Sequence, residues 1–338
     1  MGGGDGTGEE RTGAVRRRFA EAAREERPDL ALLCLLIGAE AATRGSLRGG
    51  RDTGNGNDGN DNSDNSDDSD NRDGGDGRAV RGAARGAAPD PVDEEAAVDR
   101  LVDEGQAELD RLAGLLPFGR GRTPAEWAAA LERTLGGELG FGGSAPDYRR
   151  LESSLLTEVL RRRRGLPILL SVVWTEVARR AGAPVYGVAL PGHFVVGFGD
   201  PAGAHVLADP FGGGTQLGED ELAVMVAGAT GGTPLSAASL RPAGPLETVL
   251  RILNNIRAWA APRPERSGVR LWAVELSLLL PHHPGRLRFE RAQLLVERGH
   301  FLRGAREMEE YADVVATMEP NAAENVRRAA RAARARLN

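Results

Sequence analysis

The sequence predicts an α+β fold in which one buried helix packs against a small antiparallel sheet, with further helices before and after this unit. Three observations lead to this fold class. Residues Ile168–Ala181 are apolar on most sides of a helix, which is typical of a buried helix. Short apolar runs separated by turn residues follow directly, and helical periodicity returns after Gly218 and lasts to the C-terminus.

The composition limits the classes of function. The chain has 338 residues, of which 43 are basic and 49 acidic, and its formal net charge is −6. This length is sufficient for two domains and additional disordered segments. No lysine occurs, and the mildly acidic balance argues against a general nucleic-acid-binding protein. The run Arg161–Arg164 is expected to be a solvated helix end rather than a phosphate site.

The single cysteine, Cys34, excludes an internal disulfide and a cysteine-based metal cluster. It lies in the apolar run LALLCLLIGAEA, which predicts a buried structural thiol and is too short to span a bilayer. The first residues lack the basic and apolar regions of a secretory signal, so a cytoplasmic location is expected. His282 and His283 lie in a proline-flanked turn without nearby carboxylates, and no metal or cofactor is predicted.

The N-terminal part is predicted to alternate between disordered and helical segments. Residues 1–12 are expected to be disordered, and 13–43 to be helical with a break near Pro28. The centre of 44–90 consists of Asn, Asp, Gly, Ser and Arg without an apolar residue, which predicts a disordered acidic insertion. Its aspartates resemble calcium loops, but the required spacing with a glycine and a closing glutamate is absent.

The segment 91–244 is predicted to contain several helices and the central unit. Apolar spacing predicts an amphipathic helix over Asp93–Leu115. The tetrapeptide Thr123–Glu126 has a capping threonine, a proline in the first turn and a glutamate three residues after the cap, which indicates a helix start. After the glycine-rich stretch Gly136–Pro146, a further helix is expected over Tyr148–Leu160.

The central helix has recognisable ends. Pro167 suits its first turn, because the missing amide proton would have no partner there, and Gly182 suits the position after its end. Beyond it, Phe194–Phe198 and Ala204–Ala208 flank the turn residues Gly199–Gly203, which predicts a β-hairpin. Both faces of this hairpin are largely apolar, so helices are expected to cover both of them.

The predicted hairpin brings an imidazole and a carboxylate together. If the strand pairing is centred on Pro201, His193 stands opposite Asp209, with Cβ atoms roughly 4.5–5.5 Å apart. A carboxylate at this distance orients an imidazole and raises its basicity, as in acyl-transfer sites. A buried pair of this kind can also be structural and lock a hairpin to a helix. His193 and Asp209 are therefore catalytic candidates only if a nucleophile lies next to them.

Residues 245–338 are predicted to be helical and tetratricopeptide-like. The expected helical segments are 246–260, 271–281, 286–298, 302–317 and 321–337. Arg286 and Pro320 are 34 positions apart, which is the length of one tetratricopeptide unit. Stacked helical hairpins form concave protein-binding surfaces, so a protein partner is expected in this region.

Four blocks in this order resemble a known family: EVLRRRRGLPILLSVVWTEVARRAGAP, GVALPGHFVV, LADPFGGG and VLRILNNIRAW. The sequence resembles the SirB-one-like branch of the transglutaminase-like superfamily from about residue 15 to the C-terminus, apart from the acidic insertion. The resemblance implies a papain/transglutaminase-like core followed by tetratricopeptide-type helices. It also implies a bacterial source.

The resemblance implies a catalytic Cys–His–Asp set in active members, with His193 and Asp209 in the last two places. The cysteine would stand at the start of the central helix, at or near Pro167, and proline carries no nucleophile. Ser171, four residues further on, lies on the same helix face and about 6 Å deeper, and is the alternative nucleophile. Its ordinary role would be a hydrogen bond back to its own helix.

Further side chains are expected near this cleft, namely Glu176 on the central helix and Arg163 or Arg164 before it. Two hypotheses of function follow. The first is a non-catalytic transglutaminase-like protein that binds or regulates a protein partner through its C-terminal helices. The second is a hydrolase or acyltransferase that uses His193 and Asp209, with Ser171 or water as the nucleophile. The sequence leaves the oligomeric state open.

Overall fold

The computed structural model describes residues 6–45, 91–117, 121–231 and 237–336. The predicted disordered insertion lies outside these residues except for its first two positions. The prediction for residues 1–5 also lies outside them.

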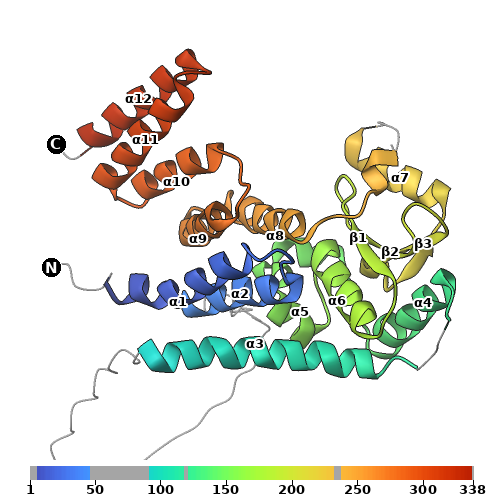
Figure 1. The fold of residues 1–338 in the computed structure, drawn as a ribbon. Helices are drawn as coiled ribbons and strands as arrows, with labels where there is room; N and C mark the ends of the chain where they lie inside the picture. Colours follow the sequence, from blue (N-terminus) through green and yellow to red (C-terminus); the bar gives the residue numbers. More distant parts are fainter. Residues whose placement is uncertain (1–5, 46–90, 118–120, 232–236, 337–338) are drawn as a thin grey trace, which may run out of the picture.

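The elements follow one another in the order seen in Figure 1. They are α1 (Gly6–Ala22), α2 (Leu30–Thr43), α3 (Pro91–Gly114), α4 (Pro124–Leu131), η1 (Glu132–Glu138), η2 (Ala145–Arg149), η3 (Leu151–Ser154), α5 (Leu156–Arg162), α6 (Pro167–Arg180), β1 (Val185–Val188), β2 (Val195–Gly199), β3 (His205–Asp209), η4 (Pro210–Gly212), β4 (Thr215–Leu217), α7 (Glu219–Thr230), η5 (Ala237–Leu240), α8 (Pro245–Ala260), η6 (Pro264–Arg266), α9 (Ser267–Leu279), α10 (Arg286–Glu297), α11 (Phe301–Val315) and α12 (Pro320–Ala335).

The predicted α+β fold is confirmed, with α6 buried against a four-stranded antiparallel sheet (Figure 1). The strands pair in the order β1-β2-β3-β4. One face of the sheet contributes Phe194, Val196 and Phe198 to the apolar cluster that contains α6 and α4. The other face packs against Leu222 and Val226 of α7. Helices therefore cover both faces, as the apolar character of both faces requires.

Short sequence signals set the ends of the helices that carry the core. Asp29 caps α2 by accepting a hydrogen bond from the Leu32 amide. Thr123 and Glu126 form the expected capping box at the start of α4. The helix α6 begins at Pro167 and is followed by Gly182, whose φ of 85° is in the left-handed region that favours glycine.

The predicted helix over Tyr148–Leu160 is replaced by two short turns, η2 and η3, and by the short helix α5. The backbone is extended at Arg150 and at Leu155, which interrupts the helical hydrogen bonds twice. The buried carboxylate of Asp147 accepts a hydrogen bond from the Ser153 hydroxyl at 3.2 Å. Local bonds of this kind compete with helix formation, and apolar spacing alone does not reveal them.

At the N-terminus, α1 begins at Gly6, so residues 6–12 are helical where the sequence predicts disorder. The segment contains no proline. A helix that is anchored by the buried side chains of Val15 and Phe19 therefore extends towards the N-terminus.

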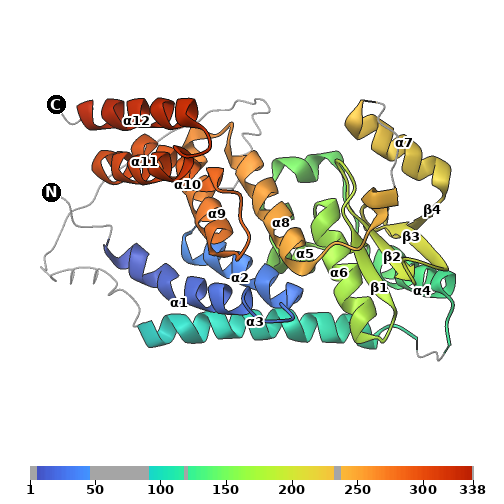
Figure 2. The same ribbon diagram turned by 45° about the horizontal axis from the view of Figure 1, so that its top comes forward.

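The apolar core is shared between segments that are far apart in the sequence. The largest cluster joins α1, α2, α6, one face of the sheet, α8 and α9. A second cluster joins α10, α11 and α12, and Figure 2 shows α11 and α12 side by side at one end of the molecule. The predicted division at residue 245 stays a prediction, because α8 and α9 pack within the first cluster and only the later helices form their own.

A chain of ion pairs connects the N-terminal helices to the C-terminal ones. Glu40 of α2 is fully buried and accepts hydrogen bonds from Arg16 at 2.9 Å and from Arg44 at 3.1 Å. Arg16 also donates to Glu275 of α9 at 2.6 Å, and Glu275 accepts from Arg291 of α10 at 3.2 Å. The positions of α9 and α10 therefore depend on charges supplied by α1 and α2.

We predict that Glu40→Gln lowers the free energy of unfolding by about 3 kcal/mol, because two guanidinium groups lose the buried charge that compensates them. Urea denaturation followed by circular dichroism measures this change. The matched control is Glu309→Gln, which removes a solvent-exposed ion pair with Arg334 and should cost less than about 1 kcal/mol. Equal effects of the two substitutions would contradict the structural role of Glu40.

Candidate functional site

The imidazole of His193 and the carboxylate of Asp209 are in contact. Nε2 of His193 lies 2.9 Å from Oδ1 of Asp209, and both side chains are mostly buried, with exposures of 13% and 14%. The same carboxylate oxygen accepts the Phe211 amide at 3.0 Å, so Asp209 also caps the short turn η4. These bonds fix the carboxylate and direct Nε2 towards it, while Nδ1 has no hydrogen-bond partner among the described residues.

The strand register that predicts this contact is wrong by two positions. The pairing of β2 with β3 is centred on Ala202 rather than Pro201, and the loop is Asp200–Ala204. His193 precedes β2 and is therefore not directly opposite Asp209. Because the shift is an even number, the parity of every position within the strands is preserved, and His193, in the turn before β2, still reaches Asp209.

The turn residue Asp200 explains the shifted register. Its carboxylate accepts the Ala202 amide at 2.9 Å, and its own amide donates to the Ala204 carbonyl at 3.1 Å. This Asx turn moves the loop by one residue towards the C-terminus, and Gly199 remains in the strand with a φ of 102°.

Arg251 on α8 anchors the turn that carries His193. Its Nη2 donates to the backbone carbonyls of Leu190 and His193, the second at 2.7 Å. Burial lowers the pKa of Arg251, and its guanidinium lies 5.7 Å from the centre of the Phe194 ring. Gly192 in the same turn has a φ of 70°, and a Cβ there would lie 2.6 Å from the Cβ of Ala229. The position of His193 is therefore fixed by α8 on one side and α7 on the other.

Sequence reasoning missed Arg251 as a functional residue. The available signal was its place in the block VLRILNNIRAW, where an arginine stands between the apolar pairs VL and IL. Its backbone partners are 58 and 61 positions away in the sequence, beyond the reach of any local pattern.

The glycine-rich stretch before η2 supports the ring that packs on His193. The rings of His193 and Phe211 meet edge to face with their centroids 5.9 Å apart. The Gly143 amide donates to the Phe211 carbonyl at 2.9 Å, and a Cβ on Gly143 would lie 1.9 Å from the Phe211 ring. Glycine is therefore required here, because the backbone passes directly over this ring.

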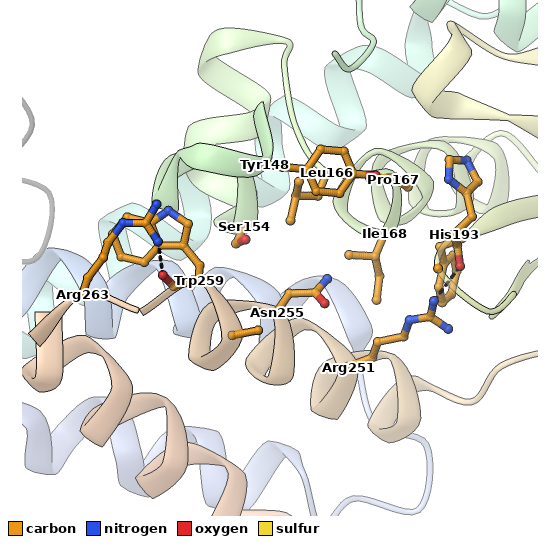
Figure 3. Close-up of a pocket in the computed structure, with 13 residues that line it drawn as sticks. Tyr148, Ser154, Leu166, Pro167, Ile168, His193, Arg251, Asn255, Trp259 and Arg263 are labelled. Carbon is orange, nitrogen blue, oxygen red and sulfur yellow. Dashed lines mark hydrogen bonds between the residues drawn. The ribbon is translucent and has the colours of Figure 1, made fainter. Parts of the chain in front are cut away.

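A cleft of about 530 Å³ lies beside His193, between α8, the start of α6 and the turns η2 and η3 (Figure 3). Pro167 lies in its wall next to His193, at the position where the resemblance expects a nucleophile. The lining residues are Tyr148, Ser154, Leu166, Pro167, Ile168, Gly192, His193, Phe194, Arg251, Asn255, Ala258, Trp259 and Arg263.

Ser171, the alternative nucleophile, does not line this cleft. It is completely buried, and its hydroxyl donates to the Phe194 carbonyl at 3.1 Å. The expected bond to its own helix is therefore replaced by one that ties α6 to the residue after His193. The hydroxyl is engaged with the backbone rather than presented to the cleft.

The other side chains expected in the cleft lie elsewhere. Glu176 is buried and bonded to Arg179 and Arg180, and it lines a separate cavity of about 420 Å³. Arg163 donates to the Leu139 carbonyl at 2.9 Å, and Arg164 pairs with the buried Asp147. None of these residues belongs to the lining of the cleft, because their partners hold them on other surfaces.

Neither a thiol nor a metal cluster completes the site within the described ranges. Cys34 is buried in α2, where burial raises the pKa of its thiol, and it does not line the cleft. No group of three His, Cys, Asp or Glu side chains is placed to hold a metal ion among the residues that the structure describes. In the same residues, no helix combines the length and apolar character needed to cross a bilayer.

Comparison with known proteins confirms the two-part organisation. Residues 93–254 match the model of the transglutaminase-like superfamily, and residues 256–338 match a tetratricopeptide repeat model. The chain therefore carries a transglutaminase-like domain followed by tetratricopeptide-like helices, as the resemblance predicts.

The curated relatives include bacterial proteins of one group. A UPF0162 protein of Xylella fastidiosa is 36% identical over 176 residues, which are 51% of this chain and 62% of that protein. A UPF0162 protein of Pseudomonas aeruginosa is 34% identical over 47% of this chain and 54% of its own length. The mouse F-box only protein 21 is 27% identical over 49% of this chain and 26% of its length. The chain thus matches somewhat over half the length of its bacterial relatives.

We predict that neutral His193 carries its proton on Nε2, because the Asp209 carboxylate only accepts hydrogen bonds. Two-dimensional ¹⁵N NMR of the imidazole nitrogens identifies the protonated one. In Asp209→Ala the preference should be lost, whereas His205, which lies on the exposed end of β3, should keep its spectrum. Protonation of Nδ1 in the unmodified protein would contradict the pairing.

Proposed function

We propose that this protein is a non-catalytic member of the transglutaminase-like group that binds or regulates a protein partner through its C-terminal helices. The observation that supports the proposal is Pro167, which fills the nucleophile position at the start of α6 in the wall of the cleft, beside His193 (Figure 3). A cytoplasmic location is part of this proposal, and the buried free thiol of Cys34 suits a reducing compartment.

The chemistry of acyl transfer needs an attacking group next to the base. His193 and Asp209 supply a base and the carboxylate that orients it, at 2.9 Å. The serine among the described lining residues is Ser154, and Figure 3 shows it on the far side of Leu166 from His193. Under this proposal, the pair keeps the turn before β2 in place and performs no chemistry.

The C-terminal helices offer a surface of the kind that tetratricopeptide proteins use for binding. A groove of about 380 Å³ between α9, α10 and α11 is lined by apolar, aromatic and charged side chains, among them Tyr311, Val314 and Arg288. Large apolar side chains are also exposed at the two ends of α11, namely Leu302 with 61% of its surface accessible and Met318 with 77%. Exposed apolar groups and a mixed-charge groove on the same helices favour a protein ligand.

We predict that the double variant Leu302→Glu, Met318→Glu loses partners that the unmodified protein captures from cells of its source, by at least tenfold in quantitative mass spectrometry. Two charges on the binding surface would have to be desolvated without compensation. The matched control is Val224→Glu on α7, which is 73% exposed and lies outside the C-terminal helices. Capture that is equal for all three proteins would contradict a role of this surface.

A second function, hydrolysis or acyl transfer, is favoured by one observation, the contact of His193 with Asp209. Ser171 or a water molecule would then attack. Turnover of amide or ester substrates by the purified protein, abolished in His193→Ala, would support this function and contradict the non-catalytic one.

We predict that Pro167→Cys creates a reactive thiol beside His193. At pH 7, iodoacetamide should modify it about ten times faster than an ordinary exposed cysteine, since a neighbouring imidazole and a helix start both favour the thiolate. Val224→Cys on α7 is the matched control, and the buried Cys34 serves as the unreactive internal reference. The rate should fall in Pro167→Cys, His193→Ala. Equal rates at positions 167 and 224 would show that residue 167 does not occupy the nucleophile position.

A further inference from the structure

We propose that the cleft beside His193 binds the C-terminal carboxylate of a peptide, with Arg251 as the group that receives it. This proposal concerns a different surface from the C-terminal groove and does not depend on the partner proposed for that groove.

The lining of the cleft is cationic, and the Asp209 carboxylate next to it is bonded to His193. Arg251 and Arg263 both line the cleft, whereas none of its described lining residues is Asp or Glu. Most other buried or half-buried arginines of the described chain are held by a carboxylate, as Arg257 is by Glu290 at 2.5 Å. Glu247, one turn before Arg251 on α8, pairs with Arg241 at 2.9 Å instead. The direct contacts of Arg251 are therefore backbone carbonyls and the Phe194 ring, and Glu247 acts on its charge only from a longer distance.

Donors remain on Arg251 after its structural bonds are formed. Nη2 serves the carbonyls of Leu190 and His193. Nη1 and Nε have no hydrogen-bond partner among the described residues, although a guanidinium carries five N–H groups. A carboxylate that entered the cleft would receive charge-assisted hydrogen bonds from a side chain whose position is already fixed.

The shape and polarity of the cleft fit an extended peptide that ends at Arg251. Arg251, Asn255 and Trp259 follow at intervals of four along α8, so they share one face over about 12 Å. Three extended residues span about 10 Å. Asn255 can donate to a peptide carbonyl and accept from a peptide amide in the middle of this line. The opposite wall is formed mainly by apolar side chains: Leu166, Pro167 and Ile168.

Arg263 and Trp259 form the end of the cleft that lies away from Arg251. The Arg263 guanidinium stacks over the Trp259 ring with 4.6 Å to its centroid and donates to the Trp259 carbonyl. The Trp259 indole itself donates to the Arg149 carbonyl at 2.9 Å. A peptide whose carboxylate is held by Arg251 would run past Asn255 towards this aromatic platform, with its last side chain against Pro167.

The experiment is an affinity selection with the full-length protein. Two mixtures of N-acetylated tripeptides, each varied at all three positions, are incubated with the protein; one mixture has free carboxylates and the other C-terminal amides. Retained peptides are identified by ultrafiltration and mass spectrometry. Selected acids should bind at least tenfold more tightly than the same sequences as amides, since the amide forms no charge-assisted hydrogen bond with Arg251. Retention of amides equal to that of acids, or no retention of acids, would overturn the proposal.

Two variants that each add one negative charge to α8 test whether the peptide acids bind in the cleft. Asn255→Asp places a carboxylate in the cleft and should abolish the selection of acids. Asn254→Asp makes the same change one residue earlier, outside the cleft, where the new carboxylate can still accept from Arg257 as Asn254 does at 2.5 Å. It should bind as the unmodified protein does. Equal behaviour of the two variants would place the binding elsewhere.

Two further arms separate this proposal from its alternatives. Inorganic phosphate at 10 mM should not displace the selected acids, and full displacement would reveal a simple anion site in place of a peptide site. The variant Leu302→Glu, Met318→Glu should retain the tripeptide acids. If this variant binds the tripeptide acids but no longer captures protein partners, the loss of capture concerns the C-terminal surface and not the cleft.

Discussion

The site depends on the hydrogen bonds between Arg251 and the backbone around His193. They connect α8 to the turn that precedes β2, across 58 to 61 positions of the sequence. A guanidinium is suited to this task because it bonds two carbonyls at once and keeps its charge when burial lowers its pKa. The contact makes the cleft a boundary between α8 and the segments that carry His193 and Pro167. Neither part forms the cleft alone.

Hydrolytic sites of this kind combine an oriented base with an attacking group. His193 and Asp209 retain the geometry of a base and its orienting carboxylate, with Phe211 packed on the ring. At the start of α6, Pro167 closes the wall with an apolar ring at the position where the resemblance expects a nucleophile. Such a cleft can still recognise a ligand, because recognition needs donors, acceptors and shape, whereas turnover also needs a nucleophile.

Local chemistry predicts what lies close along the chain. Pro167, Gly182 and the apolar runs after them are sufficient to predict α6 and the hairpin, and the parity of the strands brings His193 to Asp209 even though the register is displaced. Residues that act over long distances are not predictable in this way. Arg251 finds its carbonyls only after α8 folds onto the core, and strand β4 is too short and polar to be recognised.

The main core contains side chains from Val15 to Leu280, including α1, α2, α8 and α9. A nascent chain therefore cannot complete this core until α8 and α9 have left the ribosome. The apolar helix α2 packs on α1 and α3 but also on α6, α8 and α9, which are made much later, and contacts of such high sequence separation slow folding. We expect α2 to be the segment that chaperones shield during synthesis, because it is almost entirely apolar and its cover by α6, α8 and α9 is completed late.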